Sequence, residues 1–203
     1  MELVKVNLGC GLSVAPGWIN VDRGGYALLA RLPAGVLLRL HGRSAWRKEM
    51  SAEAYVRALK TGRFIRHDLR RGIPFPENSV DYFLASHLLD CMTAADGERL
   101  LRETWRALRP GGRIRLSVCD MEFVVALYQS GRKAEALVHL FVAADSPGNR
   151  RYTIYDFQML ERVLSAAGFV EISRRKCGEG DVPDSVVLDN RGEFSLYVEA
   201  KKP

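Results

Sequence analysis

The stretch VKVNLGCG, residues 4–11, joins a short run of strand-forming residues to two glycines one residue apart. β-Branched residues favour strands, and glycines after a strand let a ligand approach backbone N–H groups closely. In a parallel α/β sheet, ligands bind beyond the carboxyl ends of the strands. The stretch therefore predicts a first strand that ends in a ligand-binding loop, with a plain tight turn as the alternative.

Strand and helix patterns alternate along the remainder of the chain. Short apolar and β-branched runs predict strands over residues 4–8, 18–21, 64–67, 81–85, 113–118, 169–174 and 194–200. Capping residues and apolar spacing predict helices after Ser51, from Thr93 to Pro110-Gly111-Gly112, over 122–128 and 133–143, and from the Thr153/Asp156 pair to Gly168. This alternation predicts an α/β fold, with a mostly parallel seven-stranded sheet and helices on both faces.

Length and composition predict one globular domain over residues 1–203. Hydrophobic residues make up 47% and charged residues 27% of the 203 residues, which is ordinary for a globular protein with one core. No apolar run reaches the roughly 20 residues that span a bilayer. Glu2 and Lys5 interrupt any signal-peptide core. We therefore expect a cytoplasmic protein without a membrane span.

The cysteine spacing does not suggest a metal site. Four cysteines lack the C-x-x-C spacing of a zinc ribbon, and they are Cys10, Cys91, Cys119 and Cys177. We expect no bound metal, and we expect each thiol to pack as a small reduced side chain.

Positive charge is concentrated in one part of the chain. The net charge is +6, and residues 23–66 hold ten Lys and Arg against two Glu, a local +8 that leaves −2 for the rest. A localised excess of this kind favours an anionic partner at one place.

A carboxylate ends the second expected strand, WINVD, at Asp22. In nucleotide-binding α/β folds an acid after this strand binds the ribose hydroxyls. The dinucleotide-binding pattern also requires a third glycine and an acid about 20 residues further on. Val14 stands in place of that glycine, and Asp22 follows Gly11 by 11 residues. The sequence therefore disfavours an NAD enzyme.

Three blocks in order carry a family resemblance: VNLGCG…GWINVD, HDLRRGIPFPENSVDYFLASHLLD and LRETWRALRPGGRIRLSV. Together they resemble a class I S-adenosylmethionine-dependent methyltransferase, and more narrowly the small methyltransferase type 11-like group. The resemblance continues through YDFQMLERVLSAAGF to SLYVEAKKP and leaves out residues 24–60, here named the insertion. It implies a Rossmann-like class I methyltransferase fold and S-adenosylmethionine as the cofactor.

The resemblance also implies a set of cofactor-binding residues. The methionine portion would be wrapped by Asn7, Leu8, Gly9, Cys10 and Gly11, and the ribose bound by Asp22, with Arg23 next in the chain. The adenine would be flanked by Asp68 and Leu69, and the side near the transferable methyl group lined by Ser86 and His87. Because the cofactor carries a sulfonium charge and no phosphate, such a site needs backbone groups and one acid, with no Lys/Arg clamp.

Two residues are candidates for a general base, which is needed only if the acceptor loses a proton. His87 is the first, because it follows the fourth strand and an imidazole titrates near neutrality. Asp120, after the fifth strand, is the second. The alternatives are a hydrogen-bonded structural histidine and an aspartate that caps the helix from Met121.

The sequence departs from relatives in three places. Asn7 stands where most class I methyltransferases have an acid. The relatives' E-H-x-L-E-H reads SHLLDC over residues 86–91, so Cys91 replaces a second histidine, and Gly180 replaces the serine of a G-E-S segment. These departures keep open a catalytically inactive, basic or RNA-directed module, although no aromatic RNA-stacking motif is present.

The expected acceptor is a small molecule or a glycan-type compound, and an anionic one suits the local charge. The insertion leaves the ligand side of the sheet and carries most of the basic excess, so we expect it to form a helical cap on the acceptor site. A solubilising or oligomer-forming surface is the alternative. Three residues before the last long helix could border the acceptor, or be solvated: Arg150, Arg151 and Tyr152. The sequence determines neither the acceptor atom nor the oligomeric state.

Overall fold

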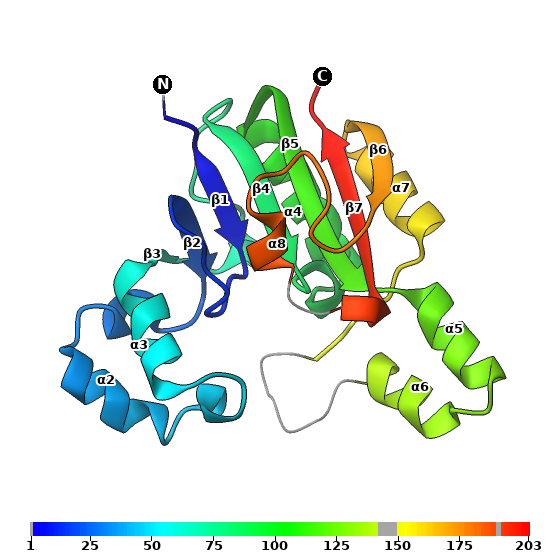
Figure 1. The fold of residues 1–203 in the computed structure, drawn as a ribbon. Coiled ribbons are helices and arrows are strands. Elements are labelled where there is room, and N and C mark those ends of the chain that lie inside the picture. Colours follow the sequence, from blue (N-terminus) through cyan, green and yellow to red (C-terminus); the bar gives the residue numbers. More distant parts are fainter. Residues whose placement is uncertain (1, 142–149, 190–191) are drawn as a thin grey trace.

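The computed structural model describes residues 2–141, 150–189 and 192–203, and within these ranges seven strands form one sheet (Figure 1). The sheet order is β3-β2-β1-β4-β5-β7-β6. The strands are β1 Lys5–Leu8, β2 Trp18–Asp22, β3 Arg63–Arg66, β4 Val80–Ser86, β5 Leu108–Cys119, β6 Val170–Arg175 and β7 Ser195–Lys201. Only β7 runs antiparallel to its neighbours, which confirms the expected mostly parallel seven-stranded α/β sheet.

Helices lie on both faces and at the carboxyl edge of the sheet. The helices are α1 Tyr26–Leu29, α2 Ala34–His41, α3 Ala52–Thr61, α4 Ala94–Ala107, α5 Met121–Gln129, α6 Lys133–Leu140, α7 Phe157–Ala166 and α8 Ser185–Leu188. Short 3-10 turns are η1 Ala45–Lys48, η2 Leu69–Arg71, η3 Leu89–Cys91 and η4 Gly192–Phe194. Figure 1 shows α4 and α7 behind the sheet and α8 in front, with α2–α3 and α5–α6 projecting past the carboxyl edge.

Two expected helix starts are confirmed, and three details are corrected. Ser51 and Thr93 cap α3 and α4 by accepting backbone N–H bonds. For α7, Asp156 alone is the cap, because the Thr153 hydroxyl donates to the Met92 carbonyl (2.9 Å). Helix α4 ends at Ala107, before Pro110, since β5 begins at Leu108. Helix α6 ends at Leu140, and residues 142–143 of its expected range lie outside the described residues.

The connection between β1 and β2 is too short to hold a crossover helix, which parallel neighbours normally use. Residues 176–189, here named the β6–β7 segment, cover that part of the front face instead (Figure 1). Val182 and Leu188 pack there against Trp18 and other buried residues. The Asp184 carboxylate accepts hydrogen bonds from the Trp18 indole (2.7 Å) and from a β1 lysine (2.8 Å). The β6–β7 segment therefore covers the part of the sheet that a crossover helix between β1 and β2 would otherwise cover.

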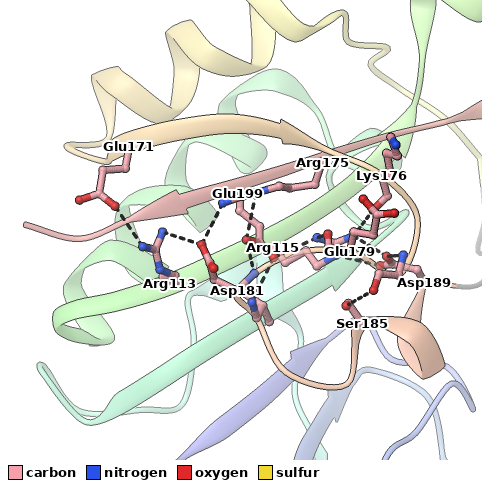
Figure 2. Close-up of polar contacts among 12 residues, drawn as sticks. Arg113, Arg115, Glu171, Arg175, Lys176, Glu179, Asp181, Ser185, Asp189 and Glu199 are labelled. Carbon is pink, nitrogen blue, oxygen red and sulfur yellow. Dashed lines mark hydrogen bonds and ion pairs between the residues drawn. The ribbon is translucent and has the colours of Figure 1, made fainter.

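A buried charge network holds the β6–β7 segment in place (Figure 2). Arg115, fully buried on β5, forms a two-point ion pair with Asp189 (3.0 and 2.5 Å) and bonds Glu199 on β7 (2.9 Å). It also donates to the backbone carbonyls of Lys176 and Glu179 (2.9 Å each). A buried ion pair contributes to a unique structure only when its remaining polar atoms are satisfied, and here both partners are.

The same network explains why residue 180, the last residue of the CGEG sequence at 177–180, is a glycine. A Cβ on Gly180 would collide with the Glu199 carboxylate, and its φ of +156° is unfavourable for other residues. Glu199 uses its two oxygens to accept the N–H groups of Asp181 (2.8 Å) and Val182 (3.1 Å). A serine side chain therefore does not fit at position 180.

The insertion has a small core of its own. Leu37 of α2 packs with Tyr55 and Leu59 of α3 and with Leu12 from the loop after β1, and all four are buried. The main core is separate and lies between the sheet, α4 and α7. The insertion is therefore a packed helical unit at the β3 edge of the sheet.

Among the described residues, no helix combines the length and the apolar character needed to cross a bilayer.

Candidate functional site

Residues 9–11, here named the glycine loop, leave the carboxyl end of β1 with left-handed backbone at both glycines. Gly9 has φ +65° and Gly11 has φ +51°, a region that residues with a Cβ avoid. The Gly9 N–H donates to the Val21 carbonyl (2.8 Å). A Cβ on Gly9 would lie 2.8 Å from the Leu88 side chain. Both glycines are therefore required by conformation, and the first also by space.

Asp22 lies beside this loop at the end of β2 and is half-buried. One carboxylate oxygen accepts the N–H of Gly11 (3.0 Å), and the other accepts the N–H of Gly24 (2.7 Å). A carboxylate offers about four acceptor positions, so about two remain for hydroxyl donors. Arg23 is exposed, and its carbonyl accepts from Arg66 (3.3 Å). The sequence-predicted loop and acid are thus brought together as one unit.

Three other residues that the sequence predicts to bind the cofactor lie in the glycine loop or in the end of β1 that leads into it. Asn7 is buried, and its amide donates to the Ser13 carbonyl (2.8 Å) and to Asn20 (3.3 Å). Leu8 is fully buried in the main core. The Cys10 thiol donates to the Gly11 carbonyl (3.3 Å), and burial, helped by Asp22, raises its pKa well above the usual value. The neutral thiol and the Asn7 amide therefore shape the loop.

The predicted adenine-side pair has local partners in the structure. Asp68 forms a two-point ion pair with Arg70 (2.9 and 2.7 Å) and caps η2. This hydrogen-bonded arginine holds the pKa of the Asp68 carboxyl well below its usual range. The Leu69 side chain is buried in the main core. In this turn, the groups available to a ligand are therefore the carboxylate oxygens of Asp68, beside Arg70, and the backbone.

At the end of β4, His87 is held by groups from distant segments. The Ser117 hydroxyl donates to Ser86 (2.9 Å), and the His87 N–H donates to the Ser117 carbonyl (2.8 Å). The imidazole Nε2 lies 2.9 Å from the Ser195 hydroxyl, and Nδ1 lies 3.4 Å from an Asp90 oxygen. His87 also has a left-handed φ of +49°. We name His87, Asp90, Arg151 and Ser195 the His87 cluster.

Asp90 is the buried anion of this cluster, with no exposed surface. Burial alone would raise its pKa, but His87 and Arg151 hold the pKa below the ordinary value. The Arg151 Nε donates to Asp90 (2.9 Å), and the guanidinium also donates to the His139 carbonyl. Asp90 is therefore ionised and shared between an arginine and a histidine.

Asp120, the second predicted base, is occupied as a helix cap. Its carboxylate accepts the N–H of Glu122 (3.0 Å) and pairs with Arg174 (2.8 Å). Arg174 also pairs with Glu122 (2.8 Å). This is the capping alternative named above for Asp120, and it leaves His87 as the better placed basic group.

The insertion meets the glycine loop through one aromatic residue. A Cβ on Gly11 would lie 3.0 Å from the Trp46 ring. The Trp46 indole donates to the Tyr26 hydroxyl (3.3 Å), and burial, with a smaller contribution from Asp22, raises the pKa of Tyr26 to about 12. The insertion's basic side chains are exposed, and they are Arg31, Arg39, Arg43, Arg47, Lys48, Arg57 and Lys60.

Sequence reasoning missed Asp90, Arg151 and Ser195 as a group, and it missed Trp46. The departure at residues 86–91 pointed to Asp90 and Cys91 without indicating what either contacts. For Arg151 the sequence offered a border to the acceptor or a solvated charge, whereas its side chain is 9% exposed and pairs with Asp90. Nothing in the sequence pointed to Ser195, which is 108 positions away from His87.

Comparisons with known proteins give a family match over part of the chain and similar structures over all of it. Residues 24–116 match the family model described as a methyltransferase domain. The S-adenosylmethionine-dependent methyltransferase SibL has a TM-score of 0.59 at 21% identity, with 100% of this chain covered and 51% of SibL. A possible exported protein from Bordetella parapertussis has a TM-score of 0.57 at 17% identity, with coverage of 100% and 63%.

A third similar structure is a possible histamine N-methyltransferase from Thermotoga maritima. Its TM-score is 0.54 at 17% identity, with 100% of this chain covered and 84% of that protein. These identities show the fold alone, and this chain spans about half to two thirds of SibL and the Bordetella protein. The chain therefore has the fold of these methyltransferase structures, and its residues 24–116 match the methyltransferase-domain family model.

Proposed function

We propose that this protein transfers a methyl group from S-adenosylmethionine to a small-molecule or glycan-type acceptor that carries negative charge. The observation that supports it most is the pairing of the glycine loop with Asp22, whose oxygens each accept a backbone N–H of Gly11 or Gly24. A cytoplasmic location, expected from the sequence, stays a prediction.

The residues present fit the cofactor. Gly9 and Gly11 present backbone without side chains, and Asp22 keeps acceptor positions for a ribose diol. When bound, S-adenosylmethionine supplies an electrophilic methyl group, and the electron pair of the broken C–S bond stays on sulfur. The protein's task is then alignment, because a sulfonium is already a good leaving group. Gly9, Gly11 and Asp22 would hold the cofactor, with Asn7 and Cys10 fixing the loop.

His87 is the proposed general base. As the bond between the acceptor atom and the methyl carbon forms, the acceptor's proton passes to Nε2 of His87. His87 lies at the end of β4, next to β1, so it shares the carboxyl edge of the sheet with the glycine loop. Its side chain is 11% exposed, which leaves it reachable.

The acceptor's charge is proposed from the insertion. Trp46 packs on the glycine loop, and the neighbouring Arg47 and Lys48 of η1 are exposed. Arg47 and Lys48 belong to η1, which contacts the glycine loop through Trp46. Their charges attract an anion at long range. We propose that the insertion forms one wall of the acceptor site.

Two measurements test the proposal. Calorimetry should show binding of S-adenosylmethionine and of its demethylated product, with NAD bound much more weakly. A small-molecule extract incubated with radiolabelled S-adenosylmethionine should yield a labelled anionic product. His87→Ala should lower turnover on that acceptor by roughly 10²–10⁴-fold while cofactor affinity stays. No binding of the cofactor would refute the function, and an unchanged rate would remove His87 from it.

A further inference from the structure

We propose that Asp90 is a positioning residue that, held ionised by Arg151, fixes His87 in the Nδ1–H tautomer, so that Nε2 carries the lone pair that takes the acceptor's proton. The inference rests on the proposed role of His87 as the base. It concerns side chains from three separate segments: the turn after β4, the strand β7 and the stretch before α7.

The first step is that the ring of His87 is confined. Its left-handed φ of +49° is uncommon for a residue with a Cβ, and such outliers persist only where surrounding contacts hold them. The N–H bond to Ser117 (2.8 Å) holds the backbone. The ring of Phe194 lies 5.6 Å from the imidazole, centroid to centroid. The imidazole therefore has little freedom to choose other partners.

The second step concerns the two ring nitrogens. An ionised carboxylate only accepts hydrogen bonds, so the nitrogen facing Asp90 must carry the proton. That nitrogen is Nδ1, at 3.4 Å from the carboxylate oxygen. Nε2 is then the acceptor, and the Ser195 hydroxyl at 2.9 Å can donate to it. Among the described residues Nδ1 makes no formed hydrogen bond, so its preference for the proton rests on the charge of Asp90 at this distance; catalytic hydrogen bonds are commonly long in ligand-free enzymes.

The third step is that Asp90 keeps its charge although it is fully buried. Burial by itself favours the neutral acid. Arg151 offsets this through its bond from Nε (2.9 Å), and the Cys119 N–H points at the same oxygen (3.4 Å). Arg151 is itself nearly buried, with 9% of its side chain exposed. The arginine therefore keeps the anion available for the imidazole.

Three other titratable groups described near the cluster have surroundings of their own. The ring of His139 on α6 is tilted against Phe194, at 4.9 Å between ring centroids, and its pKa is lowered by burial and by Arg151. Asp120 is paired with Arg174, and burial raises the pKa of Cys119 to about 11. Ser195 begins β7, which runs antiparallel to β5, so the serine lies at the same carboxyl edge as the glycine loop. Nε2 thus faces the edge at which ligands bind.

The tautomer can be measured without knowing the acceptor. In protein labelled with ¹⁵N-histidine, long-range ¹H–¹⁵N spectra distinguish the two neutral tautomers, and His87→Gln assigns the signal. We expect the Nδ1–H form of His87 in the wild-type protein. In Asp90→Asn the amide nitrogen can donate to Nδ1, so the Nε2–H form should appear. Asp96→Asn, the same change at a half-buried aspartate in the first turn of α4 that pairs with Arg99, should leave the wild-type pattern.

The outcomes separate this inference from the proposed function. The Nε2–H form in wild-type protein, or an unchanged tautomer in Asp90→Asn, overturns the inference. If Asp90→Asn does not fold, the wild-type spectrum still decides. Ser195→Ala should keep the Nδ1–H form, because Asp90 and not the serine sets it, and a switch there would also overturn the inference. Calorimetry with S-adenosylmethionine on the same samples tests the function separately, since a protein that binds no cofactor can still show either tautomer.

Discussion

The indole ring of Trp46 packs on Gly11, so that the insertion and the glycine loop share one surface. A Cβ built on Gly11 would lie 3.0 Å from Cη2 and 3.1 Å from Cζ2 of that ring. The loop expected to carry the cofactor is therefore in contact with the insertion, which lies within the family-model match over residues 24–116. We therefore expect substitutions at this contact to change the affinity for S-adenosylmethionine.

Gly11→Ala should weaken S-adenosylmethionine binding, because the new methyl group meets Trp46 and the φ of +51° is strained for alanine. Trp46→Ala in the same protein should restore part of the affinity by removing the collision. Gly131→Ala is the matched control: it has φ +85°, with nothing within 4 Å of its Cβ. Calorimetry measures the S-adenosylmethionine affinity of the wild type, Gly11→Ala, the Gly11→Ala/Trp46→Ala double variant and Gly131→Ala. Equal affinity in the wild type and Gly11→Ala would contradict the prediction.

Asp22→Ala should lower cofactor affinity roughly tenfold to a hundredfold. It removes charged hydrogen bonds worth about 1.5–3 kcal/mol and leaves the N–H groups of Gly11 and Gly24 without their partner. Asp156→Ala, which removes an aspartate cap from α7, should cost stability and leave the dissociation constant alone. If the two variants bind the cofactor equally well, Asp22 is not in the site.

Charge reversal of Arg43, Arg47 and Lys48 to Glu should spare cofactor affinity and raise the KM for the acceptor. The salt dependence of that KM should also weaken, because long-range attraction between charges is what salt screens. Reversal of Arg102 and Arg162, exposed on α4 and α7 behind the sheet, should change neither. A KM unaltered at low salt would show that the three cations take no part in acceptor binding.

Arg115→Met should destabilise the protein by about 3–5 kcal/mol, the usual result of leaving buried charges without their partner. Both Asp189 and Glu199 would then be buried anions without the guanidinium between them. Arg113→Met, on the same strand, removes partly exposed pairs with Glu171 and Asp181 and should cost about 1 kcal/mol or less. Urea denaturation compares the two, and similar midpoints would contradict the prediction.

Asp184→Asn should destabilise the protein at neutral pH, with a deficit that closes in acid. Hydrogen bonds from Lys5 and Trp18 lower the pKa of Asp184 in the folded state. A lowered pKa means stability that is present above the ordinary value of about 3.9 and is lost as the pH falls through the folded-state value. Thermal unfolding of both proteins from pH 7 downward measures this, and a deficit independent of pH would argue against it.

Local sequence signals predicted much of the fold and the proximity of the glycine loop to Asp22. The glycine loop and Asp22 are encoded within 14 residues, and strand patterns with the Ser51 and Thr93 caps located most elements to within a few positions. The ion pair between Asp68 and Arg70 is also local, but no sequence pattern indicated it. The contacts that the sequence predicted therefore join residues close together in the chain, although not every such contact was predicted.

What could not be predicted depends on contacts between remote segments. Ser195 reaches His87 only because β7 enters the sheet beside β5, and Arg151 reaches Asp90 across 61 positions. Trp46 belongs to the insertion, where no sequence motif indicates what its side chain contacts. The cap of α7 went to Asp156 because Met92, far earlier in the chain, offered Thr153 a carbonyl. Side-chain partners of this kind follow from topology, which periodicity alone does not supply.

The β6–β7 segment also determines when the protein can finish folding as it is synthesised. Lys5 and its partner Asp184 are 179 positions apart, so the front of the first strand emerges from the ribosome long before its cover exists. Until then the apolar face around Trp18 and Leu84 is open to solvent and to other nascent chains. Folding of this sheet is therefore completed only after the β6–β7 segment has been translated, and chaperone binding to the nascent chain should persist until that segment emerges.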